Sequence, residues 1–244
     1  MVEQPLQTVF GMQQNNVHIL ITRPVDDTLI EQAKESGLDM EVISFIETEP
    51  IQTVELQQEI ENALLQTATV VFTSANAVEA VAAQLDGQDP DWEIFCIGKK
   101  TKELVEEYFG QHHIAGYASN AGDLAQVIID STNADEIIFF CGDQRRPELP
   151  HTLKQQGIRV EEIVVYQTVG VPRKVNKNYQ GILFFSPSAV DSFFELNKAT
   201  DKTIFFAIGN TTAEAIRKHT TNKTVVSAQP GKNHLVEMAI EYFT

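Results

Sequence analysis

Short loops rich in serine, threonine, asparagine and glycine follow several apolar runs of this chain, and each loop opens a helical pattern. A helix that begins in such a loop offers free backbone N–H groups and the positive end of its dipole, which favour anions. The loops therefore predict binding of anionic groups at these helix ends. The residues that carry the pattern are Thr73, Ser74, Thr101, Gly122, Ser186, Pro187, Ser188, Thr211 and Thr212.

The same residues are also suited to capping helices, which is the simpler interpretation of each one taken alone. Ser186 followed by a proline is typical of an N-cap before the first helical position. Thr211 with Glu214 fits a capping box. Thr101 and Thr212 each end a Gly-x-x-Thr loop, and we expect them to contribute to caps as well. Because equivalent loops occur twice in the chain, we expect anion binding in addition to capping.

Arginines supply a second kind of contact to anions. Arg23 directly follows the apolar run at 17–22, and Arg145 and Arg146 follow the run at 136–141. A guanidinium group binds a carboxylate through two parallel hydrogen bonds. A solvated loop charge is the alternative for each of them. Arg23 is the best placed for binding, because it comes immediately after its strand-like run.

Other kinds of chemistry have no support in the sequence. Neither a Gly-x-Gly-x-x-Gly motif nor a phosphate-binding Gly-Lys-Ser/Thr loop is present, and no local motif indicates a nucleophilic triad. The histidines show no metal-ligand spacing, since His112 and His113 are adjacent and adjacent residues rarely share a ligand geometry. Cys96 and Cys141 lie inside apolar runs and are expected in the core. We therefore expect neither a cofactor nor a metal.

The elements that position these loops alternate between strand-like and helical runs along the whole chain. Several strand-like runs are continuous in valine, isoleucine and phenylalanine, as in parallel strands that are covered on both faces. This alternation predicts an α/β, doubly wound architecture, in which ligands bind at the carboxyl ends of the strands. We expect strands at 17–22, 40–45, 69–73, 93–97, 113–117, 136–141, 160–166, 181–186, 203–208 and 223–228.

An internal repeat organises these elements into two domains. The segment 137–168 resembles the segment 19–48, because both contain a strand, an arginine-bearing loop, a helix, a glycine turn and a strand. The middle of the chain can then supply a complete five-strand unit, whereas the N-terminal part lacks three strands. We predict an inserted domain at 48–170, with its connectors, and a discontinuous domain made of 1–47 and 171–244, in which 1–16 is a polar extension.

The formal net charge of −16 argues against nucleic acid as a partner, since binding to a phosphate backbone needs a basic face. No leader-like segment and no apolar run approaching the roughly 18 residues of a membrane span is seen, so we expect a cytoplasmic protein. Surface carboxylates are screened beyond about 8 Å at physiological ionic strength. Short-range donors in the loops can therefore still bind an anion.

The ordered set FTSANAV, CIGKKT, AGDLAQVI, GIRVEEIVVYQT, ILFFSPSAV and AIGNTTAEAI resembles uroporphyrinogen-III synthase. The resemblance runs from about residue 17 to the end, and its most specific segment contains Tyr166. It implies two flavodoxin-like parallel-sheet domains joined by a two-stranded connector, with a ligand cleft between them. It also implies a lyase of haem biosynthesis that needs no cofactor. The substrate would be hydroxymethylbilane, a linear tetrapyrrole that carries acetate and propionate carboxylates.

The implied reaction removes water at the ring A hydroxymethyl group, inverts ring D and closes the macrocycle. Tyr166 matches the family's tyrosine and is the candidate catalytic residue. A phenol, with an ordinary pKa of about 10, stays protonated and can donate to the leaving oxygen. Thr101 and Thr212 match the family's Gly-x-x-Thr positions. We treat them, together with Arg23 and the other loop residues named above, as substrate-binding candidates.

Two other functions stay open from the sequence. The first is a non-enzymatic two-domain receptor for anions, which would close about a hinge. The second is a family member that has lost activity, although Tyr166 together with Thr101 and Thr212 favours an enzyme. A nucleotide-dependent enzyme has less support. No pattern determines the oligomeric state, and we expect a monomer.

Overall fold

In the computed structural model, residues 17–229 and 231–244 are described, so the expected polar extension at 1–16 lies outside them. The chain divides into two compact units. Unit 1 consists of the segment up to Glu47 together with Gly170–Thr244, and unit 2 consists of Thr48–Val169. No helix within the described residues is long and apolar enough to cross a membrane.

Unit 1 contains a five-stranded sheet in the order β11-β10-β9-β1-β2, and all of its strand pairs are parallel. Taken in chain order, this is the 2-1-3-4-5 arrangement of flavodoxin-like sheets. The strands are β1 (Val17–Ile21), β2 (Leu38–Val42), β9 (Gly181–Phe184), β10 (Ile204–Ala207) and β11 (Thr224–Val226). The helices are α1 (Asp27–Glu35), α7 (Pro187–Leu196), α8 (Asn210–His219) and α9 (Lys232–Phe243).

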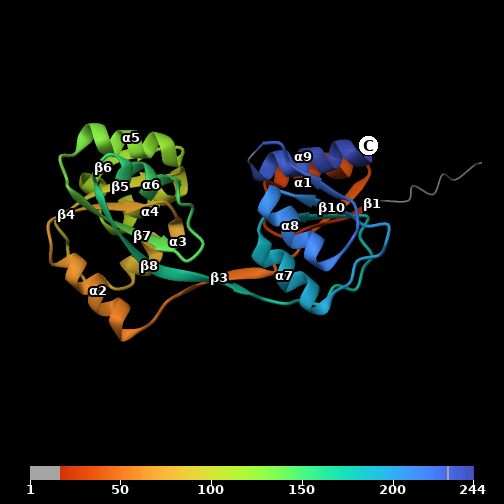
Figure 1. Cartoon of the computed structure of the whole chain (residues 1–244), viewed down its shortest axis with the longest axis horizontal. Coiled ribbons are helices and arrows are strands. Elements are labelled where there is room, and N and C mark those ends of the chain that lie inside the picture. The colour runs from red at the N-terminus through yellow and green to blue at the C-terminus, as the bar shows by residue number, and fades with distance from the viewer. Residues whose placement is uncertain (1–16, 230) are drawn as a thin grey trace, which may run out of the picture. The chain divides into compact units, whose positions relative to one another are not determined.

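Helices cover both faces of the unit 1 sheet (Figure 1). In β1, Ile19 and Ile21 belong to the core under α1 and α9, whereas Leu20 belongs to the core under α7 and α8. Phe184 of β9 packs against Phe193 of α7, with ring centroids 5.6 Å apart. Full burial of such a side chain contributes about 1.5–3 kcal/mol. The continuous apolar runs of the sequence thus arise because neither face of these strands meets water.

Unit 2 contains a six-stranded sheet in the order β3-β8-β7-β4-β5-β6. When its strands are taken in the sequence β7, β8, β4, β5 and β6, the same 2-1-3-4-5 arrangement appears, so β7 occupies the place that β1 has in unit 1. This equivalence explains why 137–168 resembles 19–48. The strands are β3 (Ile46–Pro50), β4 (Ala68–Phe72), β5 (Trp92–Ile97), β6 (Ile114–Ala118), β7 (Glu136–Gly142) and β8 (Arg159–Gly170).

The faces of the unit 2 sheet carry two separate helix layers (Figure 1). Val70 and Phe72 of β4 face one core, and Val71 faces the other. Cys96 and Cys141 are buried free thiols, and burial raises the pKa of each to about 11, so their prediction as core residues is confirmed. One layer contains α2 (Val54–Leu64), α3 (Ala75–Ala82) and α4 (Lys99–Tyr108), and the other contains α5 (Ala121–Ser131) and α6 (Glu148–Gln155).

The strand β3 pairs with β8 and was not expected from the sequence as a strand. The Ile51 N–H donates to the Val165 carbonyl at 3.0 Å, and the Val171 N–H donates to the Phe45 carbonyl at 2.8 Å. From the first bond to the second, the residue number falls from 51 to 45 in one segment and rises from 165 to 171 in the other, so the two segments run antiparallel. The chain passes between the units along these two segments, which form the expected two-stranded connector. The sequence of β3 is acidic and mostly exposed, so no apolar pattern marks it.

All ten predicted strands are present, and the predicted α/β fold class is confirmed. The largest differences are at strand ends. The strand β2 ends at Val42 rather than at Phe45. Phe45 is fully buried beyond the strand, against the ring of Phe193 at 5.3 Å. An apolar residue that packs on a helix next to a strand is not distinguished by sequence from one inside the strand.

Candidate active site

Each sheet has one point at which its strand order reverses, and there the helices that follow two neighbouring strands leave toward opposite faces. In unit 1 these strands are β1 and β9, because α1 and α7 belong to different cores. In unit 2 they are β7 and β4, which lead to α6 and α3 in different cores. The diverging helices leave the carboxyl ends of the two strands uncovered, and this is where ligands bind in open α/β sheets.

A pocket of about 360 Å³ lies at this point of unit 2. Thr73 and Ser74 reach it from the loop after β4, and Arg145 and Arg146 reach it from the loop after β7. Tyr166 of β8 completes the wall. Side chains predicted separately from the sequence therefore meet in one pocket, and they include both arginines of the 143–146 loop.

The position of Tyr166 depends on a missing side chain. Gly142 lies opposite Tyr166 in the β7–β8 register, at an irregularity that follows Cys141. A Cβ atom at Gly142 would lie 2.7 Å from the Tyr166 hydroxyl oxygen and closer still to its ring carbons. The ring is half-buried, and its hydroxyl has no hydrogen-bond partner among the described residues. It is therefore available to donate to a ligand.

The two arginines of the pocket differ in their partners. Arg145 forms an ion pair with Glu162, which also binds the Lys154 ammonium group at 2.9 Å. Burial raises the pKa of the Glu162 carboxyl, but hydrogen bonds from Lys154 and Arg145 outweigh that effect and lower it overall. Arg146 is exposed and pairs with no carboxylate in the described part of the chain. Of the two, Arg146 has the uncommitted charge.

The Gly-x-x-Thr loops form helix starts of one kind in both units, but the predicted caps are wrong. The N-caps of α4 and α8 are Gly98 and Gly209, and neither makes a side-chain cap bond. Thr101 and Thr212 are the third residues of their helices, and Thr211 is the second of α8. A capping side chain must precede the helix on an extended backbone. These threonines already lie inside the first turn, so the proposed capping box with Glu214 does not form.

The threonine hydroxyls at these helix starts are open to a ligand. The side chains of Thr101 and Thr212 are buried, with 5% and 1% of their surface exposed. No hydrogen-bond partner for either hydroxyl is found among the described residues. The sealed side-chain polar atoms without a partner in that part of the chain are Ser192 Oγ and Asn233 Oδ1. Both threonine hydroxyls therefore lie, largely buried and without a bond to the described residues, next to the N–H groups of the first helical turn.

The serine caps predicted at the other loops are present. The Ser74 hydroxyl accepts from the Ala77 N–H, and the Ser186 hydroxyl accepts from the Ala189 N–H, both at 3.3 Å. Pro187 occupies the first position of α7, as the sequence predicted, and Ser188 follows it in the first turn. The Ser74 hydroxyl satisfies one N–H of α3 and leaves the N–H groups of Ala75 and Asn76 for a ligand, whereas Pro187 has no N–H group at the start of α7.

Gly122 does not line the unit 2 pocket, although it lies next to it. It is the second residue of α5, whose N-cap Asn120 accepts from the Asp123 N–H at 2.9 Å. Asn120 and Ala121 line the pocket. The predicted loop therefore adjoins the pocket, but the polar side chains that line it there are those of Ser119 and Asn120. The single sequence offered a signal for Asn120, since asparagine is a preferred N-cap.

In unit 1 the equivalent point carries Arg23 and the start of α7. The Arg23 guanidinium lies over the Phe185 ring, 5.9 Å from its centroid, and no carboxylate within the described ranges pairs with it. Thr22, which the sequence reasoning missed, donates from its hydroxyl to the Leu183 carbonyl at 2.8 Å. This buried bond joins the ends of β1 and β9. Arg23 is thus an exposed, unpaired cation on a fixed strand end.

A larger hollow in unit 2, of about 500 Å³, lies at the opposite, amino-terminal edge of the sheet. Its lining is acidic, and its one arginine, Arg159, is paired with Glu136 at 2.9 Å. An anionic ligand would be repelled there, so size does not identify the binding site. The carboxylates in this lining belong to Asp91, Glu93, Asp135, Glu136 and Glu161.

Fold and site together define an α/β protein with two flavodoxin-like units, whose strand ends carry exposed arginines and helix N-termini. Residues 27–237 match the family model for uroporphyrinogen-III synthase HemD. The chain therefore belongs to the uroporphyrinogen-III synthase family. The predicted family resemblance is confirmed by this match.

Individual relatives agree with the family. The uroporphyrinogen-III synthase of Saccharomyces cerevisiae is 31% identical over 84 residues, which cover 31% of this chain and 30% of the yeast protein. The structure of the enzyme from Helicobacter pylori aligns with a TM-score of 0.57 at 14% identity, over 93% of this chain and 99% of that one. A mutant of the Thermus thermophilus enzyme aligns with a TM-score of 0.52 at 14% identity, over 93% and 98%. These two structures share the fold.

The correction of the caps gives a first prediction. Ser74→Ala and Ser186→Ala should each lower the free energy of unfolding by about 0.5–2 kcal/mol, because each removes a cap bond. Thr101→Val should lower it by less, since its hydroxyl bonds to nothing in the described chain. Urea denaturation of the three variants measures the difference. An equal loss for Thr101→Val would mean that this hydroxyl stabilises its helix after all.

A second prediction concerns Gly142. Gly142→Ala should destabilise the protein by about 1–3 kcal/mol, because the added methyl group overlaps the Tyr166 ring. Combining it with Tyr166→Leu should recover part of that loss, and denaturation of both single variants and the double variant measures the coupling. Gly209→Ala is the matched control, since a Cβ there meets nothing within 4 Å. Strict additivity would show that the ring is not held against Gly142.

Proposed function

We propose that this protein is a uroporphyrinogen-III synthase, a lyase that cyclises hydroxymethylbilane with loss of water and inversion of ring D. Family membership supports the proposal. The observation that carries it is the unpartnered hydroxyl of Tyr166 in a pocket that also contains the unpaired Arg146. A proton donor beside an uncommitted cation suits a polycarboxylate substrate with a hydroxyl leaving group.

Recognition of the substrate would rest on its carboxylates. Arg146 in unit 2 and Arg23 in unit 1 are exposed guanidinium groups without carboxylate partners among the described residues. The uncapped N-termini of α4 and α8 add free N–H groups, with the hydroxyls of Thr101 and Thr212 beside them. Each unit then contributes one arginine and one Gly-x-x-Thr helix start. We therefore propose that these groups bind carboxylates in each unit.

The chemistry asks little of the protein beyond positioning and one proton donor. At ring A the bond between the methylene carbon and the hydroxyl oxygen breaks, the pyrrole nitrogen supplies electrons to the carbon, and the Tyr166 hydroxyl donates to the departing oxygen. The substituted carbon of ring D attacks that methylene and gives a spiro intermediate. Fragmentation and recombination then invert ring D. Holding both ends of the linear substrate in one geometry favours this route over direct closure.

The other residues of the rims would orient the substrate. Thr73 lines the pocket beside the Ser74 cap, and Ser186, Pro187 and Ser188 occupy the equivalent loop of unit 1. We propose that these loops bind carboxylates chiefly through backbone N–H groups, because the two serine hydroxyls are already bonded to their helices. Thr211 and Gly122 would act in the same way, as parts of helix starts.

We further propose that the enzyme acts as a monomer in the cytoplasm and binds no nucleic acid. The net charge of −16 supports the last point, because it opposes a phosphate backbone. Two reduced, buried thiols are consistent with a reducing compartment. The same charge predicts little electrostatic acceleration of substrate association, so binding would depend on short-range contacts at the rims.

Isomer analysis of the product tests the function directly. Hydroxymethylbilane generated in situ should give uroporphyrinogen III with the purified protein, whereas the spontaneous reaction gives the unrearranged I isomer. A binding protein without activity would protect the substrate or leave the I isomer as the product. Either of those results would replace the enzyme by the non-enzymatic receptor or by the inactive family member.

Tyr166→Phe tests the role of the hydroxyl. General acid assistance is typically worth about 10²–10⁴-fold, and this range is the outer limit of the expected fall in turnover. We expect a fall near the low end, because water can partly replace the tyrosine as the donor. The variant should stay folded and form the III isomer, since the geometry of the bound chain ends decides inversion. Turnover and melting temperature are measured together. Tyr117→Phe, at an exposed tyrosine outside the pocket, is the control. Unchanged turnover in Tyr166→Phe would remove the tyrosine from the mechanism.

A further inference from the structure

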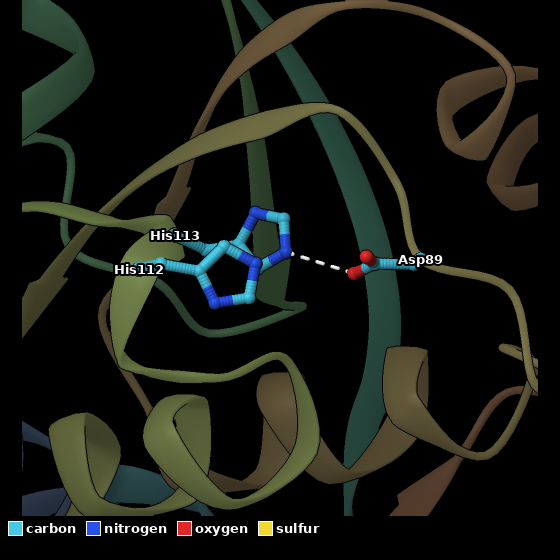
Figure 2. Close-up of side chains that lie close together, drawn as sticks. All are labelled: Asp89, His112 and His113. Carbon is cyan, nitrogen blue, oxygen red and sulfur yellow. Dashed lines mark hydrogen bonds and ion pairs between the residues drawn. The ribbon is translucent and has the colours of Figure 1, made fainter.

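Three potential metal ligands meet in unit 2, outside the pocket described above: two adjacent histidines and an aspartate from an earlier part of the chain. One ligand atom each of Asp89, His112 and His113 lies within 4.8 Å of the other two. Figure 2 shows the two imidazole rings side by side, with the Asp89 carboxylate facing them from a separate loop. All six histidines of the chain are within the described residues. Among those residues, Asp89, His112 and His113 are the one group in which three or more potential metal ligands come together.

The hydrogen bonds of His113 determine which of its nitrogens faces Asp89. His113 Nδ1 lies 3.0 Å from the Trp92 carbonyl oxygen, which can only accept, so Nδ1 carries a proton. The neutral ring then has its lone pair at Nε2, 2.9 Å from an Asp89 carboxylate oxygen. Two acceptors at that distance repel unless a proton or a metal cation lies between them. A backbone carbonyl on the far nitrogen is also the usual support of a metal-bound histidine.

The surroundings hold the three donors on defined backbone. Trp92 begins β5, and its indole N–H donates to the Ala63 carbonyl at 3.0 Å, which fixes the segment that orients His113. His112 and His113 end the 3₁₀ turn η1 (Gln111–His113) before β6. The His112 ring lies against Gly110, where a Cβ would be 2.9 Å from its Nδ1. His113 is buried, whereas Asp89 and His112 are exposed and can adjust to an ion.

We propose that Asp89, His112 and His113 form a binding site for a divalent transition metal, with Zn²⁺ as the best match. Two imidazoles and one carboxylate suit zinc, and one open position would hold water. Zinc bonds of about 2.0–2.2 Å place neighbouring ligand atoms roughly 3.3 Å apart. The His113–Asp89 pair is already near that separation. The ion would join the loop before β5 to the turn before β6.

The sequence alone gave no sign of this site, and we expected no metal from it. His113 and Asp89 are 24 residues apart, and two adjacent histidines match no common ligand spacing. The site lies at the starts of β5 and β6, whereas Tyr166 and its pocket lie at the opposite ends of the strands. The metal is therefore not needed for the proposed reaction, and the two proposals can fail separately.

Zinc titration of the full chain by calorimetry tests the site, with ZnCl₂ as the ligand after removal of metals with a chelator. We expect one zinc ion per chain and an affinity that weakens as pH falls and protons compete for the imidazoles. Asp89→Asn and His112→Gln change the two exposed ligands and should each lower the affinity at least about 10-fold, since even outer partners of a metal site cost 10–100-fold. Both variants keep the buried His113 and its bond to the backbone.

His219→Gln is the matched control, because His219 forms a comparable 2.8 Å pair with Asp191 but has no second histidine beside it. It should bind zinc as the unmodified protein does. In nitrogen-15 NMR spectra, zinc should shift the imidazole signals of His112 and His113 and leave that of His219 unchanged. The proposal would be overturned if the unmodified protein showed no saturable zinc binding. It would also be overturned if Asp89→Asn and His112→Gln both bound zinc as tightly as the unmodified protein, because the group would then be an ion pair only.

Discussion

The reversal of strand order at one point of each sheet is the constraint on which the rest of the structure depends. A parallel sheet covered on both faces requires strands that are apolar on both sides, and Phe72 with Val71 shows how neighbouring residues serve opposite cores. Such a sheet leaves its polar groups at the strand ends. Where the helices part, those ends are uncovered, and the same feature occurs between β7 and β4 as between β1 and β9. The binding residues of both units are placed by topology rather than by local sequence.

Charge distribution makes the two edges of the unit 2 sheet chemically different. The amino-terminal edge gathers carboxylates around its hollow, and its arginine is neutralised by Glu136. The carboxyl-terminal edge holds Arg146 without a carboxylate partner among the described residues, next to helix N-termini. A protein with a net charge of −16 can therefore still present a local site for anions. Because distant charges are screened, a ligand at that edge would respond chiefly to the groups that line it, which are Arg145, Arg146, Glu148 and the nearby helix N-termini.

The sequence predicted features that depend on periodicity and failed where the outcome depends on distant contacts. The strands, the repeat and the Ser186 cap follow from local patterns. The place of Thr212 does not, because α8 begins two residues earlier at Asn210, after the N-cap Gly209, which lacks a capping side chain. The role of Gly142 needs the register of β7 against β8, and the meeting of Asp89 with two histidines needs the packing of two loops. Neither leaves a trace in a single sequence.

The pairing of β3 with β8 brings the beginning and the end of unit 2 together. Ile51 and Val165 share a hydrogen bond at one position, and Phe45 and Val171 share another just outside the unit. The two segments of unit 1 are therefore hydrogen-bonded to each other at the place where the chain leaves for unit 2 and returns from it. If unit 2 were removed from the chain, a short turn between the segments of Phe45 and Val171 would be enough to connect β2 to β9. Apart from β3, the strands of the whole chain, taken in chain order, occupy positions 1-2-3-4-5 of the flavodoxin-like sheet twice in succession, which is the order of a tandem repeat whose two copies share their strands between the units.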